Sequence, residues 1–473
     1  LLRERQARIR AWQETPDAPE ALAAIPVLRL DQIPAEPEEL PLVRETIGGL
    51  PALYHELHTS GITYLDLYFA LDDMPAERLT QLSFLCGLIS RLDTDRYSLN
   101  ELQREVRSRF GSLGFTVQSF EAYGRPDQCR TFLRASCSVL DGKVERAVEL
   151  LEELLLRTRW NDAGKVFALL RQARAALSQQ IVMNGHSYAV GRACAGVSAS
   201  AAVEELAGGV AYLKWLKELE EGFQERFPAL ASDLEALAGA VFTKARLTLG
   251  ATAGSAAAVE SAARRLSKGL PEGEYAPPAV PAVTPWGARR EGIVIPADIS
   301  FVGMSGPFPE AGSGAAKGMC RAASLAYLWN AVRVQGGAYG AGMVPRDAGL
   351  AAFYSFRDPN AARTLACCRK TPEFLESVGD ADLTGFIIGA VAESDPLLTP
   401  RMKGAVADSR YWKGIGVEDL RRVRRELLSA KPRDVAALAA SLRRAVDAGS
   451  VCVLGSQRQI DACAGQIDTV ELL

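Results

Sequence analysis

The sequence has few metal-binding residues and lacks the usual metal and phosphate motifs. Its only histidines are His55, His58 and His186, and neither HExxH nor HxxEH occurs in its 473 residues. The HELH pair lies in a segment that we predict to be a strand, where residues three apart point to opposite faces. We therefore predict no metal site in this chain. GxxxxGK[ST] is also missing, which removes the signature of a P-loop.

Cysteine pairs, excess charge and long apolar runs are missing too. The nine cysteines form no CxxC pair and their number is odd, which favours reduced thiols in a reducing compartment. The net charge of −3 gives no general attraction to nucleic acid or to an anionic membrane. No run approaches the roughly 20 apolar residues of a membrane span. The charged start, LLRERQARIRAW, is no signal peptide. We predict a cytoplasmic, bacterial protein, with an organelle matrix as the alternative.

The order of predicted elements occurs twice along the chain. ITYLDLYFALDDMP corresponds to ISFVGMSGPFPE, and the hairpin FTVQSFEAYG…CRTFLRASCSV corresponds to GAYGAGMVP…GLAAFYSFRD. A closing strand and helix, RLTLGATAGSAAAVESAARRL, correspond to SVCVLGSQRQIDACAGQI. Strand pairs joined by tight turns favour antiparallel pairing. We predict an α+β fold with two tandem homologous domains, each a largely antiparallel sheet packed with helices.

Proline marks the boundary between the two units. Residues 269–291 contain five prolines, which cannot occupy a helix interior or a central strand. We therefore predict a linker at 269–291 between domains at 41–268 and 292–473. Residues 1–40 are predicted to be a helix followed by an extended connector. The chain does not begin with methionine, and we expect a piece of a longer protein.

The segment RVQGGAYGAG raises a functional question. We predict a helix over SLAYLWNAVR, with Arg333 in its last turn, where a cation is favourable. Tyr339 would then begin a strand. Four glycines leave little side chain in this segment: Gly336, Gly337, Gly340 and Gly342. They could simply end the helix, or they could leave a strand edge open to an extended peptide. In the second interpretation, Arg333 and Tyr339 would bind a peptide carbonyl or the oxyanion formed from it.

Several stretches together resemble a known family. They are LHTSGITYLDLYFAL, NGHSYAVGRACAG, ISFVG, YLWNAVRVQGGAYGAG and FYSFRDPN, which together span almost the entire chain. The chain resembles the C-terminal half of the presequence protease and falcilysin group of pitrilysin-type zinc metallopeptidases. The resemblance implies the fold of LuxS and the mitochondrial processing peptidases, with four homologous domains in two halves. It also implies an inverted HxxEH zinc site in the first domain, a motif that this sequence lacks.

The resemblance assigns roles to individual residues. Arg333 and Tyr339 match an arginine and a tyrosine that bind the substrate backbone and stabilise the tetrahedral intermediate. Gly336, Gly337, Ala338 and Gly340 are implied to contact the substrate. The domain at 41–268 is implied to be structural, and 1–40 to include the end of a helical hairpin. We assign no role to His186.

The resemblance also implies cofactor and partners. Zinc would be bound by the N-terminal half of the protease, and none by this chain. The partners would be that half and short unstructured peptides, which are degraded in a closed chamber. This chain alone is expected to be inactive. The alternative is a non-catalytic pitrilysin-like subunit, scaffold or peptide-binding module that pairs with a separate zinc-bearing chain. The sequence does not specify the cleavage preference.

Overall fold

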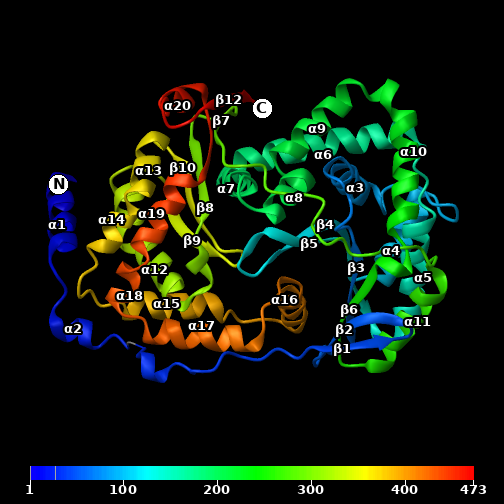
Figure 1. Cartoon of the computed structure of the whole chain (residues 1–473), viewed down its shortest axis with the longest axis horizontal. Helices are drawn as coiled ribbons and strands as arrows, with labels where there is room; N and C mark the ends of the chain where they lie inside the picture. Colours follow the sequence, from blue (N-terminus) through cyan, green and yellow to red (C-terminus); the bar gives the residue numbers. More distant parts are fainter. Residues whose placement is uncertain (1, 27) are drawn as a thin grey trace.

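Two six-stranded sheets stand side by side in the computed structural model, which describes residues 2–26 and 28–473 (Figure 1). Residues 1 and 27 of the predicted segment 1–40 lie outside this description. The first sheet has the order β1-β2-β6-β3-β5-β4. Its strands are β1 (Val43–Ile47), β2 (Leu50–Glu56), β3 (Ile62–Ala70), β4 (Ser112–Ala122), β5 (Arg125–Leu140) and β6 (Leu247–Ala253).

The second sheet repeats this pattern in the order β12-β7-β11-β8-β10-β9. Its strands are β7 (Arg290–Val294), β8 (Ser300–Pro307), β9 (Gly340–Arg346), β10 (Leu350–Asp358), β11 (Ser450–Gly455) and β12 (Thr469–Leu472). The β2–β6 and β7–β11 pairs are parallel, and the three following pairs in each sheet are antiparallel. The predicted fold class, with two homologous and largely antiparallel units, is confirmed. Only the outermost strands differ, because β1 joins β2 in a hairpin whereas β12 pairs in parallel with β7.

Helices fill the segments between the strands. Those of the first half are α3 (Ala76–Leu88), α4 (Leu99–Arg109), η2 (Asp141–Lys143), α5 (Val144–Leu156), α6 (Ala163–Met183), α7 (Gly185–Ala195), α8 (Ala199–Gly208), α9 (Val210–Glu221), α10 (Phe223–Val241), η3 (Lys244–Arg246) and α11 (Ala256–Gly269). Those of the second half are η4 (Pro309–Gly312), α12 (Gly314–Ala322), η5 (Ala323–Val334), α13 (Ala361–Arg369), α14 (Thr371–Glu376), α15 (Thr384–Ser394), α16 (Pro400–Lys413), α17 (Val417–Ser429), α18 (Pro432–Ala436), α19 (Ala439–Ala448) and α20 (Gln457–Asp461). Within the described residues, none of these helices is both long and apolar enough to cross a membrane.

Strand β3 shows how both faces of a sheet are buried. Leu65, Leu67 and Phe69 belong to the main core of the first half. Tyr68 points to the opposite face, because side chains alternate along a strand. There it contacts Trp412 of α16, with ring centroids 5.6 Å apart. A helix from the second half therefore covers the outer face of the first sheet.

The exchange is reciprocal, because α7 of the first half packs on the second sheet. Ala189 and Ala193 of α7 share a core with Phe301 and Cys452. Gly303 of β8 makes this approach possible, since a Cβ there would lie 2.2 Å from the Ala189 main chain. The predicted division into 41–268 and 292–473 does not anticipate this exchange. Residues 270–289 carry neither helix nor strand, as their prolines predicted.

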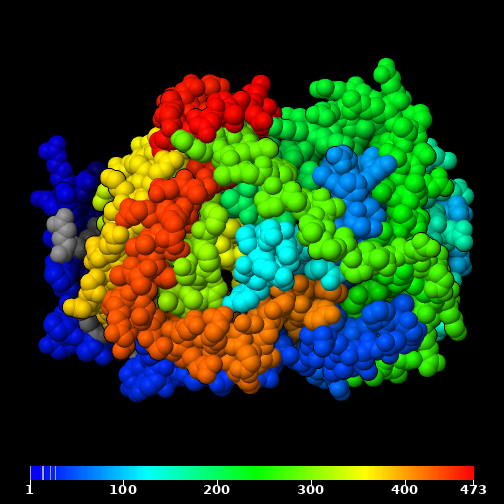
Figure 2. All heavy atoms as spheres, in the orientation of Figure 1, coloured from blue at the N-terminus to red at the C-terminus, as the bar shows by residue number. Residues whose placement is uncertain are grey.

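Polar contacts also join the two halves. At the tip of the β4–β5 hairpin, the Tyr123 N–H donates to the Lys413 carbonyl and the Gly124 N–H to the Asp347 carbonyl. Arg192 of α7 is buried and pairs with Glu291 at 2.9 Å and with Glu205 at 3.3 Å. Figure 2 shows a hollow between the hairpin tip, in cyan, and the second sheet, in yellow-green.

The N-terminal segment runs along the outside of the second half. It comprises α1 (Leu2–Glu14), α2 (Pro19–Ala23), η1 (Leu30–Gln32) and an extended stretch that passes α17 before entering β1 (Figure 1). Arg421 of α17 pairs with Glu36 at 3.0 Å and also with Glu39. The predicted helix and extended connector are therefore present in the described part of 1–40, and ion pairs hold the connector in place.

Candidate functional site

The helix before the predicted site is not regular. The sequence predicted one α-helix from residue 314 to Arg333, but α12 passes into the π-helix η5 at Ala323. The Ser324 hydroxyl donates to the Cys320 carbonyl at 2.7 Å, and so competes with its own N–H for the acceptor of an α-helical turn. It also accepts from the Met343 N–H of β9 at 2.9 Å. Ser324 thus ties the wider helix to the neighbouring strand. Such π-helical turns are rare and often occur at functional sites.

The turn after η5 is fixed by its own backbone. The Gly337 N–H donates to the Arg333 carbonyl at 2.9 Å, and the Ala338 N–H donates to the Val332 carbonyl at 3.2 Å. Gly337 has a φ of +84°, and a Cβ on Gly336 would lie 2.4 Å from the Val332 oxygen. Both glycines are therefore required by the turn itself. The side chain of Ala338 is buried.

Arg333 and Tyr339 come together on the surface, as their spacing suggested. The Arg333 guanidinium lies 4.1 Å from the ring centroid of Trp329 and 5.4 Å from that of Tyr339. The Tyr339 ring also meets Phe356 edge-on at 5.7 Å. Tyr339 is nevertheless 65% exposed. The cation is thus held between two aromatic rings by cation–π attraction, and the pair remains accessible from outside.

Strand β9 is an edge strand, but only part of its edge is open. Gly340 begins the strand, which pairs on one side with β10. On the other side, Ser324 bonds to both the N–H and the carbonyl of Met343. A Cβ on Gly342 would lie 2.8 Å from the Tyr354 hydroxyl, so this glycine has a local packing reason. The predicted approach of a peptide backbone is therefore confined to the Gly340 end of the strand.

Two residues near the pair were not singled out from the sequence. Trp329 precedes Arg333 by four positions, and this spacing alone places both on one side of a helix. Arg357 was left without a role. It has a φ of +49°, which is unfavourable for a residue with a Cβ, and its carbonyl lies 3.3 Å from the Tyr339 N–H. The bulge that strains Arg357 has no sequence signal, because the sequence shows no register shift.

The cap predicted for the helix after β10 is wrong. Asp358 is buried and accepts from the Asn360 N–H at 2.8 Å. Asn360 is the residue that caps α13, through the Arg363 N–H. Asp358 instead stabilises the turn into the cap, and Pro359 precedes the helix.

The first half reaches this site through His186. Its ring lies 4.7 Å from that of Phe356 and 6.2 Å from that of Tyr354. Among the described residues, its Nδ1 has no hydrogen-bond partner, and burial lowers the pKa of the imidazole. His186 therefore lies behind Phe356 as a neutral ring, one side chain away from Tyr339.

The other two histidines are separated, as strand geometry predicted. His55 is fully buried and contacts Asp408. His58 is exposed beyond the end of β2 and lies 3.3 Å from the Ser60 hydroxyl. Across the part of the chain that the structure describes, no group of three or more His, Cys, Asp or Glu is placed to hold a metal ion.

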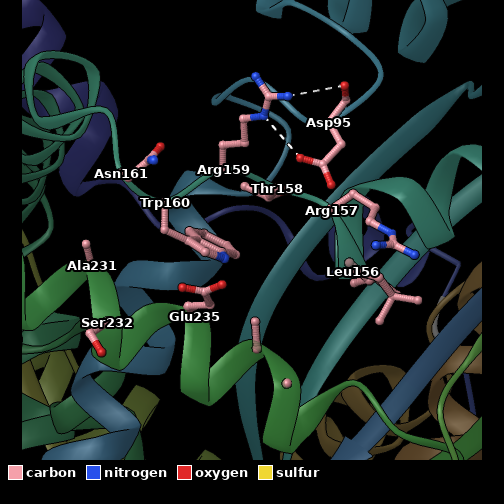
Figure 3. A pocket seen from close by; sticks show the side chains of 13 residues that line it. Asp95, Leu156, Arg157, Thr158, Arg159, Trp160, Asn161, Ala231, Ser232 and Glu235 are labelled. Carbon is pink, nitrogen blue, oxygen red and sulfur yellow. Dashed lines mark hydrogen bonds and ion pairs between the residues drawn. The ribbon is translucent and has the colours of Figure 1, made fainter.

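A second pocket lies in the first half, well away from Arg333 and Tyr339. It has a volume of about 530 Å³ and lies between α10 and the segment that joins α5 to α6 (Figure 3). Arg159 on its rim pairs with Asp95 at 3.1 Å. Trp160 is buried in its wall, and Glu235 of α10 faces it (Figure 3).

Comparisons with known proteins agree with the architecture. A family model for the peptidase-associated region of peptidase family M16, subfamily C, matches residues 1–219, and one described as "PreP C-terminal domain" matches 290–456. Presequence protease 1 of Arabidopsis thaliana is 29% identical over 463 residues, covering 95% of this chain and 42% of its own length. Protein HypA of Clostridium perfringens is 26% identical, covering 96% of this chain and 47% of its own. The chain thus spans less than half the length of these relatives.

Solved structures share the fold. A conserved protein from Enterococcus faecalis has a TM-score of 0.62 at 12% identity, covering 89% of this chain and 99% of its own. A peptidase M16 inactive domain from Pseudomonas fluorescens has a TM-score of 0.56 at 15% identity, covering 88% and 98%. The fold is that of the M16 peptidases. Within them, the chain belongs to the presequence protease group, and it corresponds to the C-terminal half of such a protease.

Proposed function

We propose that this chain is the C-terminal half of a zinc-dependent endopeptidase that degrades short unstructured peptides in a closed chamber. Its contribution would be to bind the substrate backbone and to stabilise the oxyanion. The observation that supports this most strongly is the accessible Arg333–Tyr339 pair, which cation–π contact holds together at the open end of an edge strand.

The geometry suits the proposed roles. Arg333 carries a permanent charge and rigid N–H donors that can bind a peptide carbonyl. The phenol of Tyr339 can donate to the oxygen that becomes negative as the carbonyl is attacked. Because Trp329 and Phe356 hold both groups in place, little reorganisation is needed when the charge develops. Gly336, Gly337, Ala338 and Gly340 would let the substrate backbone come close to the pair.

Zinc would lie in the half that this chain does not include. The described residues offer no set of donors for it, so water activation is not among the steps that this chain performs. When bound in the other half, zinc would supply the Lewis acid and the nucleophile. The alternative is a separate non-catalytic subunit or peptide-binding module. The mass of the natural polypeptide separates the two, since a species near twice 50.9 kDa supports the first and one near 50.9 kDa the second.

Hydrolysis of an unstructured peptide tests the proposed roles. In the natural protein, Arg333→Ala or Tyr339→Phe should lower turnover by at least about tenfold, as for the loss of one oxyanion donor. The exposed Arg433 provides the control Arg433→Ala, which should leave turnover unchanged. This chain by itself should not hydrolyse the peptide. Unchanged kinetics in both site variants would end the assignment of these roles.

A further inference from the structure

A pocket beside the Arg333–Tyr339 pair is lined by apolar side chains that remain exposed. It has a volume of about 480 Å³ and lies between β9, η5, α12 and α15. Leu325 is 42% exposed, Trp329 40% and Val344 42%. Three large apolar residues open to one pocket are unusual on a surface that has no partner, and such patches mark binding sites. Met343 and Ala341 add further apolar wall.

Trp329 connects this pocket to the proposed site. It lines the pocket, and its ring centroid is 4.1 Å from the Arg333 guanidinium. An extended peptide advances about 3.3 Å per residue. A peptide whose carbonyl is held by Arg333 therefore has a side chain within one or two residues of Trp329. The pocket also follows the free side of β9, which is the side on which an added strand would lie.

The opposite end of the pocket is polar. Arg321 of α12 pairs there with Glu393 of α15, and Lys317 and Asp347 complete that wall. This end limits the depth available to an apolar group. The arrangement fits one large apolar side chain against Trp329, Leu325 and Val344, with the ion pair behind it.

We propose that this pocket is a specificity subsite that takes a large aliphatic or aromatic side chain of the bound peptide, and that Trp329 forms its wall toward Arg333. The inference rests on the proposed function, because it assumes that Arg333 holds the peptide backbone. It adds a side-chain preference, which the sequence did not specify.

The test uses quenched fluorescent peptides of ten residues in the natural protein. An alanine-rich peptide is compared with a series in which phenylalanine replaces alanine at one position at a time. Burying one aromatic ring should raise kcat/KM at least about tenfold at one position. Trp329→Ala and Leu325→Ala should reduce this ratio to below about threefold, whereas Trp329→Phe should keep most of it.

Controls separate this inference from the proposed function. Trp12, which is 77% exposed on α1, provides Trp12→Ala, which should leave the ratio unchanged. Leu325→Ala tests the pocket without removing the ring beside Arg333. If no position prefers phenylalanine, or if the ratio survives both pocket variants, the subsite is refuted. If Arg333→Ala then still lowers both peptides equally, the proposed function stands. If Arg333→Ala changes neither peptide, both proposals fail.

Discussion

A buried proton-sharing pair fastens α16 of the second half to the first sheet. The His55 Nδ1 lies 2.7 Å from the Pro41 carbonyl, and its Nε2 lies 2.8 Å from an Asp408 oxygen. The Tyr68 hydroxyl donates to the other Asp408 oxygen at 2.9 Å. A carbonyl can only accept, so Nδ1 must carry a proton. The contact to Asp408 then requires a second proton, on either Nε2 or the carboxyl group.

Loss of His55 should weaken this junction strongly. His55→Leu keeps the volume similar but leaves the Asp408 carboxylate buried with only Tyr68 as donor. Removing one partner of a buried pair costs about 3–5 kcal/mol. At about 2–4 °C per kcal/mol, the melting temperature should fall by roughly 10 °C. Asp408→Asn should cost much less, because its amide can donate to a neutral His55 while its oxygen accepts from Tyr68.

The pH dependence follows from the shared proton. Burial opposes the charge on His55, but Asp408 and the Pro41 carbonyl outweigh it, and the pKa of His55 is raised. Burial likewise raises the pKa of Asp408. Asp66 adds to both shifts, although it is itself paired with Arg134 at 2.8 Å. The stabilisation is therefore complete below about pH 6.5, the value of an unfolded histidine, and is lost as the pH rises through the raised pKa.

Thermal unfolding between about pH 6 and pH 9 is the assay. Wild type should lose stability toward the alkaline end more steeply than Asp408→Asn. The matched control is His58→Ala, three residues away and exposed, which should change little. If His55→Leu melts with His58→Ala, or if Asp408→Asn keeps the wild-type pH slope, the reasoning about the pair is wrong.

Two further predictions concern the interior. Arg192→Met leaves two buried glutamates without a cation and should reduce the free energy of unfolding by at least about 3 kcal/mol, measured by urea titration. The exposed Arg289 gives the control Arg289→Met, and equal losses would refute the dependence of the contact between the halves on Arg192. For thiol chemistry, Cys367 is the only one of the nine cysteines that is not buried, and burial raises the pKa of others such as Cys137 to about 12. A thiol reagent should therefore label at most one site in the folded protein and none in Cys367→Ser, whereas fast labelling of several thiols would contradict the packing.

The duplicated order of elements could be read from the sequence because each unit has its own strong local signals. Alternation in ITYLDLYFAL predicts β3 and its register, and the prolines of 269–291 exclude regular structure. The exchange of α7 and α16 could not be read in this way. Both helices carry small or apolar residues that would suit either sheet, and only the three-dimensional approach of Ala189 to Gly303 decides the matter.

The candidate site was predictable to a similar extent. The spacing of Arg333 and Tyr339 across a glycine turn predicts that they lie close together. Trp329 could have been added from helical periodicity. The change to a π-helix at Ala323 could not, since it depends on Ser324 bonding to Met343, nineteen positions later. Arg357 is strained by a bulge in β10, and pairing irregularities of this kind leave no pattern in one strand.

The most direct test of the proposed roles is a double-mutant cycle on the Arg333–Tyr339 pair. Turnover of an unstructured peptide is measured for Arg333→Ala, Tyr339→Phe and the double variant in the natural protein. Each single change should cost at least about tenfold in kcat, and the double variant should lose less than the product, because both groups act on one oxygen. Wild-type turnover in either single variant, or losses that multiply fully, would contradict a shared grip on the peptide bond.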